Sequence, residues 1–184
     1  MLLAAERSQL LVIDLQERLL PAIAGSDRVL RNVHILLRAA ALLGVPVTVT
    51  EQNPGGLGRT VASVLDLLSP QTPILPKISF AATGDPALRE RIAALSMSGR
   101  DQVVLCGTEA HVCVLQTALG LRAGKSEVIV VGDAVSSRVP DSASVAGDRL
   151  RHAGCHWVTT EMAVFEWLER AGTGSFRALL PLLK

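Results

Sequence analysis

Three side chains that could cooperate in covalent catalysis follow predicted strands: Asp14, Lys77 and Cys113. A thiol is a weak nucleophile until it is deprotonated. A helix N-terminus and a nearby ammonium group both favour the thiolate and lower the pKa of the thiol. Cys113 falls in the first turn of a predicted helix, where unpaired N–H groups could hold an oxyanion. Asp14 could accept the thiol proton, and Lys77 could stabilise the charge, so these residue types predict acyl transfer.

Each of these residues also has a structural interpretation. An Asp at a strand end is most often a turn or capping residue, a lone Lys is usually solvated, and a Cys in a first helical turn is often a small buried apolar group. We interpret Cys106 and Cys155 as structural. His111 could in principle replace Asp14 as the base, but two residues along a helix it points away from Cys113. A place in a pocket wall is the stronger interpretation of His111.

Other patterns that could carry chemistry are weaker. His152 and His156 have the spacing of two metal ligands on one helix, but Gly154 ends that helix between them. His156 should therefore open a strand and point elsewhere, and we expect no metal and no cofactor. Residues 55–58 (GGLG) follow the second strand but lack the Lys-Ser/Thr ending of a phosphate loop. We interpret this segment as a flexible lid or turn.

The elements that must position these residues alternate regularly along the chain. Strands are predicted at residues 9–13, 45–50, 73–75, 102–106, 127–131 and 156–159. Helices are predicted at residues 28–43, 60–68, 85–95, 112–122, 142–153 and 161–169, with a short last helix at 176–183. Several strands are continuous apolar runs, which is typical of parallel strands buried on both faces. The alternation predicts one α/β domain over residues 1–184, with three layers (α/β/α).

Strand ends explain why the candidate residues could meet. In an open parallel sheet, ligands bind beyond the carboxyl ends of the strands, where the strand order reverses. Asp14 follows the first predicted strand, Lys77 the third, and Cys113 the fourth. An acid, a base and a thiol could therefore converge on one rim of the sheet.

Composition limits the class of protein. Hydrophobic residues make up 49% of the 184 residues and charged residues 19%, which excludes a disordered chain. The net charge of +1 and the scattered Lys and Arg supply no field for nucleic acid or anionic lipid, and no apolar run could span a membrane. Three cysteines without an export signal indicate a reducing compartment, so we expect a cytoplasmic protein with a small-molecule substrate.

Five segments in order resemble the isochorismatase-like hydrolases, and together they cover nearly the whole chain. They are LLVIDLQERLLPAI, TEQNPGGLGRTV, PKISFAAT, LCGTEAHVCVLQTALGLRAGKSEVIVVGDAVSSR and RHAGCHWVTTEMAVFEWL. The fourth is the most specific, and the fifth resembles the small isochorismatase-domain hydrolases of bacteria and animal mitochondria. The resemblance implies a Rossmann-like, six-stranded parallel sheet with the order 3-2-1-4-5-6, and a homo-oligomer (dimer or higher).

The resemblance also implies roles for single residues. Asp14 matches the general base, Lys77 the charge-stabilising lysine, and Cys113 the nucleophile. The cis peptide of the family falls at Thr108–Glu109, and the oxyanion hole would be the N–H groups of Glu109 and Cys113.

The pocket wall implied by this alignment is mostly neutral. It would comprise Gln16, Gln52, Leu57, Phe80 and His111. Such a lining does not identify the substrate.

Two departures from family patterns narrow the chemistry. Metal-dependent nicotinamidases carry an Asp-x-His motif and further His residues after the second strand, where this chain reads Glu51-Gln52-Asn53-Pro54. This difference implies that a nicotinamidase-type metal site is lacking. Isochorismatases proper lack the cysteine and hydrolyse a vinyl ether, so Cys113 favours hydrolysis of an amide or a related acyl group.

Three hypotheses follow for the function. The first is a cysteine hydrolase that cleaves a small C–N bond through a thioester. The second is a catalytically idle binding or scaffold protein on the same fold, against which the intact set of Asp14, Lys77 and Cys113 speaks. The third is a nucleotide-binding protein, which the lack of a phosphate loop disfavours.

Overall fold

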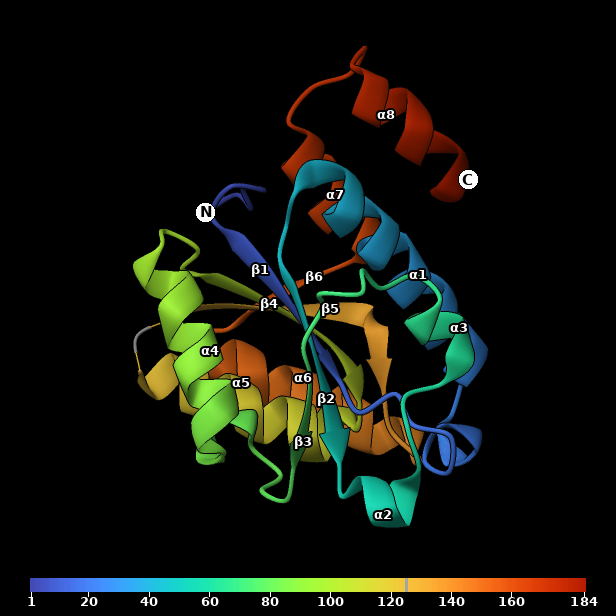
Figure 1. Ribbon diagram of the computed structural model, residues 1–184, viewed down its shortest axis with the longest axis vertical. Coiled ribbons are helices and arrows are strands. Elements are labelled where there is room, and N and C mark those ends of the chain that lie inside the picture. The colour runs from blue at the N-terminus through green and yellow to red at the C-terminus, as the bar shows by residue number, and fades with distance from the viewer. Residues whose placement is uncertain (125) are drawn as a thin grey trace.

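A six-stranded, all-parallel sheet forms the middle layer of the structure, a computed structural model that describes residues 1–124 and 126–184 (Figure 1). The strand order is β3-β2-β1-β4-β5-β6, which confirms the predicted sheet and its order. The strands are β1 (Ser8–Ile13), β2 (Val47–Gln52), β3 (Ile74–Lys77), β4 (Gln102–Thr108), β5 (Glu127–Ser136) and β6 (His156–Val158). The order reverses between β1 and β4, so the carboxyl ends of these two central strands mark the expected place for a site.

Helices cover both faces of the sheet (Figure 1). They are α1 (Ser26–Leu43), α2 (Pro54–Leu57), α3 (Ala62–Leu65), α4 (Pro86–Met97), α5 (Leu115–Ala123), α6 (Pro140–His152), α7 (Thr160–Leu168) and α8 (Gly174–Leu179). Short 3-10 turns occur at Leu20–Ala22, Ala82–Gly84 and Leu180–Leu182, and a π-helical turn occurs at Ala110–Val114. No helix of the described residues is both long enough and apolar enough to cross a membrane.

The core is divided by the sheet into two clusters. Successive residues of a strand point to opposite faces, so Leu10 and Val12 of β1 pack with α1 and α7, whereas Leu11 and Ile13 pack with α4, α5 and α6. All six residues of β1 are buried. Burial on both faces explains why the central strands are continuous apolar runs instead of alternating ones.

Several strands extend further toward their carboxyl ends than the apolar runs predict. The run of β5 stops at Gly132-Asp133, but the strand continues to Ser136 because the β4–β5 register shifts and Val135 pairs with Gly107. Polar residues likewise end β2 and β3, so Lys77 is the last residue of β3 and does not follow it. The predicted carboxyl ends of β2, β3, β4 and β5 therefore fell short of the observed ones, whereas the predicted end of β1 was right.

Helix predictions were wrong near two loops. Residues 55–57 lie in the short helix α2 and Gly58 caps its end, where a flexible lid or turn was expected, because Pro54 begins a single turn of helix there. Helix α3 covers only Ala62–Leu65 of the predicted 60–68, since Thr60 is held outside the helix by hydrogen bonds to the carboxylate of Glu51. As predicted, His156 begins a strand.

Candidate active site

Asp14 and Lys77 form a buried ion pair at the carboxyl ends of β1 and β3. The Lys77 Nζ donates a hydrogen bond to Asp14 Oδ2 at 2.7 Å, and both side chains are 0% exposed. Strand β2 separates β1 from β3, so the long lysine side chain crosses the end of β2 to reach the carboxylate. Two residues that are 63 positions apart in the sequence thus meet because the strands are parallel and in register.

The Asp14 carboxylate is held on its other oxygen by β2. The Thr50 hydroxyl donates to Asp14 Oδ1 at 2.5 Å, and Thr50 lies opposite Ile13 in the β1–β2 register. Asp14 itself adopts a positive φ of 50°, a strained conformation for a residue with a side chain. The Thr108 hydroxyl donates to the main-chain oxygen of Asp14 at 2.8 Å, which joins Asp14 to the end of β4.

The Lys77 ammonium has three acceptors, which matches its three N–H donors. Besides Asp14, these are Gln52 Oε1 at 2.6 Å and the main-chain oxygen of Phe80 at 3.3 Å. Phe80 is 53% exposed, and it contributes its carbonyl group to this network. A fully buried ammonium is tolerated only with such complete pairing.

Cys113 lies in the π-helical turn Ala110–Val114 that follows β4. The pKa of the Cys113 thiol is raised to about 12, because burial and the Asp14 carboxylate raise it by more than the Lys77 ammonium lowers it. Lys77 thus acts in the expected direction, but the expectation of a lowered pKa for this thiol was wrong, because desolvation outweighs the effect of Lys77. Cys113 at rest is therefore a thiol beside a carboxylate.

The segment between β4 and Cys113 brings main-chain donors to the same place. The peptide bond between Thr108 and Glu109 is cis. The N–H group of Glu109 has no hydrogen-bond partner within residues 1–124 and 126–184. Its carboxylate accepts from the main-chain N–H of Arg138 at 2.9 Å and from Arg138 Nε at 3.1 Å, which fixes this segment against the end of β5. A free N–H here could stabilise a developing oxyanion.

Gly107 allows β4 to approach β1 closely. Its φ is +113°, and a Cβ at this position would collide with the main-chain oxygen and nitrogen of Ile13. Only glycine accommodates both the backbone conformation and the contact. The glycine therefore brings the end of β4, which leads to Cys113, against the residue that precedes Asp14.

The residues expected in the pocket wall occupy different environments. The Gln16 side chain is buried and bonds to the main chain of Gln52 and of Gly58, so it fastens the segment after β2. Leu57 is half-buried in α2. Gln52 contacts Lys77 directly.

His111 lies apart from the ion pair. Its Nδ1 is 2.8 Å from Ser137 Oγ, and its side chain lines a cavity of about 350 Å³ against α6. The lining of this cavity contains neither Asp14 nor Lys77 nor Cys113. His111 is consequently not placed to serve as the base for Cys113.

The sequence analysis did not identify Thr50, the second partner of the Asp14 carboxylate. A signal was present, since Thr50 is a polar residue in a predicted strand that is buried on both faces.

In the described part of the chain, no three His, Cys, Asp or Glu side chains are grouped so that they could hold a metal ion.

Comparison with known proteins identifies related chains. The sequence-family model of the isochorismatase domain matches residues 8–162 of this chain. A secreted isochorismatase effector, Isc1 of Phytophthora sojae, is 36% identical over 96% of this chain and 84% of its own length. The isochorismatase domain-containing protein 2 of Danio rerio is 36% identical over 98% of this chain and 89% of its own length. The structure described as MAR1 ribonuclease from Caenorhabditis elegans superimposes with a TM-score of 0.92 at 32% identity, over 100% of this chain and 92% of its own.

Proposed function

Because the chain belongs to the isochorismatase family of hydrolases, we propose that it hydrolyses an amide-like C–N bond of a small molecule through a Cys113 thioester. Asp14 is the general base in this proposal, and Lys77 stabilises charge. The observation that carries it is the buried Asp14–Lys77 ion pair beside the Cys113 thiol. A buried ion pair is costly to desolvate, and here Thr50 and Lys77 orient the carboxylate by one hydrogen bond to each of its oxygens.

The exposure of Asp14, Lys77 and Cys113 supports the different roles proposed for them. The Asp14 and Lys77 side chains have no exposed surface, whereas Cys113 retains 6%. A substrate would therefore reach the thiol first, and the ion pair would act from behind it. This arrangement fits the proposal that Cys113 attacks the substrate while the buried Asp14 accepts its proton.

The reaction begins with proton transfer. Asp14 takes the proton of Cys113, and the Sγ attacks the carbonyl carbon, whose oxygen becomes negatively charged. The N–H groups of Glu109 and Cys113 hold this oxyanion. The C–N bond then breaks as the nitrogen takes the proton from Asp14, and the amine leaves a thioester on Cys113.

A water molecule completes the cycle. It gives a proton to Asp14 and attacks the thioester carbon, and the C–S bond breaks as Cys113 regains its proton. The products are a carboxylic acid and an amine. Throughout, Lys77 keeps the charge of Asp14 paired in a site from which water is largely excluded.

A raised thiol pKa is consistent with this cycle. A thiol that stays protonated at rest needs an adjacent base at the moment of attack, and Asp14 supplies one. A catalytically idle binding protein has no need for a base, an ammonium group and a thiol buried together.

The test is a substrate screen with matched variants. The protein is incubated with a panel of small primary amides and, separately, with single-stranded RNA, because the Caenorhabditis elegans relative is described as a ribonuclease. We expect ammonia release from at least one amide, its loss in Cys113→Ala, and its retention in the control variant Cys155→Ala. RNA cleavage that survives in Cys113→Ala, with no amide turned over, would reject the proposal.

A further inference from the structure

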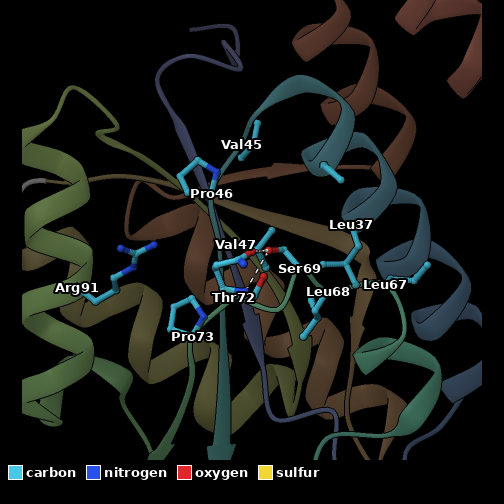
Figure 2. Close-up of a pocket in the computed structure, with 12 residues that line it drawn as sticks. Leu37, Val45, Pro46, Val47, Leu67, Leu68, Ser69, Thr72, Pro73 and Arg91 are labelled. Atoms are coloured by element: carbon cyan, nitrogen blue, oxygen red, sulfur yellow. Dashed lines mark hydrogen bonds between the residues drawn. The ribbon is translucent and has the colours of Figure 1, made fainter.

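A second cavity lies at the opposite end of the sheet from Asp14 and Lys77. It measures about 230 Å³ and lies between α1, the start of β2 and the segment that leads into β3 (Figure 2). Most of its lining is apolar: Leu37, Ala41, Val45, Pro46, Val47, Leu67, Leu68 and Pro73. An engineered apolar cavity of roughly 150 Å³ admits benzene. The space is therefore sufficient for one small ring or a short aliphatic chain.

One cationic side chain faces this apolar lining. Arg91 reaches from α4 toward the start of β2, across from Leu67 and Leu68 (Figure 2). Its Nε is buried and has no hydrogen-bond partner, a property that it shares only with His34 Nε2 in the described part of the chain. None of the ion pairs found among the described residues includes Arg91. A buried guanidinium donor without an acceptor lacks the partner that proteins normally supply.

The edge of β2 offers a second unpaired donor at the same place. Val49 donates its N–H to Pro73 on the β3 side, and main-chain groups alternate sides along a strand, so the Val47 N–H also faces the β3 side. The β2–β3 ladder begins only at Val49 and Ile74. The Val47 N–H has no partner among the described residues, and Val47 lines the cavity.

We propose that this cavity binds a small organic carboxylate whose apolar body lies against Leu67 and Leu68. The carboxylate pairs with the guanidinium group of Arg91, since the two groups match in charge and in planar geometry. The second carboxylate oxygen lies on the side of the Val47 N–H. An apolar space with a few convergent polar groups is the usual form of a small-molecule site.

This site is separate from the candidate active site. Val47 begins β2 and Gln52, which contacts Lys77, ends it. Five residue steps along a strand separate them by about 16 Å. The inference therefore does not depend on the reaction proposed for Cys113.

The experiment titrates 4-fluorobenzoate into the full chain. Binding is followed by ¹⁹F NMR of the ligand and by the backbone amide spectrum of the protein. We expect saturable binding that shifts the amide signals of Val47 and Leu68. Arg91→Gln should weaken binding by about tenfold or more, because a charge-assisted hydrogen bond is lost. The neutral isostere 4-fluorobenzamide should bind more weakly than the carboxylate.

Two further variants control for folding and location. Arg89→Gln removes the same charge from an exposed position of α4 that points away from the cavity, and it should change the affinity by less than about twofold. Ala41→Phe, at an exposed lining position of α1, should fill the space and abolish binding. The proposal is wrong if Arg91→Gln and Arg89→Gln bind equally, if Ala41→Phe still binds, if the wild type shows no saturable binding, or if the shifted amides lie around Cys113.

Discussion

The Lys77 ammonium group lies 2.7 Å from the Asp14 carboxylate, and neither side chain has any exposed surface. A buried ion pair contributes little net stability, but removing one partner leaves an uncompensated charge in the interior. Replacing either Asp14 or Lys77 is therefore expected to lower the stability of the fold as well as to change the candidate active site.

Lys77→Met should destabilise the protein by about 3–5 kcal/mol, because Asp14 then remains buried without its cation. The double variant Asp14→Asn/Lys77→Met should be less destabilised than Lys77→Met alone. Denaturant unfolding at pH 7 measures both, and Lys184→Met at the exposed chain end serves as the control. A double variant that is less stable than Lys77→Met would show that the charges are not coupled.

The two charges beside Cys113 should change its reactivity in opposite directions. Asp14 raises the pKa of the Cys113 thiol and Lys77 lowers it. Asp14→Asn should therefore accelerate alkylation of Cys113 by iodoacetamide at pH 8, and Lys77→Met should slow it, since the thiolate is the reactive form. Peptide mapping by mass spectrometry gives the rate at each cysteine. Changes of the same sign in both variants would contradict the arrangement.

Alkaline pH should destabilise the folded protein through Cys113. Burial raises the pKa of this thiol to about 12 in the folded state, while an unfolded cysteine titrates near 8.5. The contribution of this thiol to the free energy of unfolding is thus fully present below about pH 8.5. It is lost as the pH rises toward 12, because the unfolded chain releases the proton first. The free energy of unfolding should fall by up to about 1.4 kcal/mol per pH unit for this group.

The variant Cys113→Ala isolates that contribution. The wild type and the variant are unfolded with denaturant between pH 8 and pH 11, and the slopes of their unfolding free energies are compared. The chain contains no Tyr, so no phenol titrates in this range. The slope should be shallower in Cys113→Ala, and equal slopes would be inconsistent with a raised thiol pKa.

Thr50 should act as a positioning residue for the base. Its hydroxyl donates to Asp14 Oδ1, and hydrogen bonds to charged groups are worth about 1.5–3 kcal/mol. Thr50→Val should lower kcat by about tenfold or more with little change in KM. The control is Thr48→Val, which alters a buried threonine two residues earlier on the same face of β2. Equal losses in the two variants would indicate a packing effect only.

The sequence predicted the parallel sheet and the strand end that carries Asp14, because apolar runs reveal strands that are buried on both faces, but it ended the fourth strand two residues before Thr108. It could not predict Thr50 as a partner of Asp14, since this contact depends on the register that places Thr50 opposite Ile13. It also misjudged the pKa of Cys113. Residue types show which charges are available, but only the structure shows that Lys77 is already paired and that burial dominates.

The central claim is that Cys113 carries the acyl group. The most direct measurement mixes the protein rapidly with 4-nitrophenyl acetate, a generic acyl donor, and records both the release of 4-nitrophenol and the mass of the digested protein. We predict a burst of one 4-nitrophenol per chain and one acetyl group on the peptide that contains Cys113, with neither in Cys113→Ala. An undiminished burst in Cys113→Ala, or an acetyl group on another residue, would contradict the account.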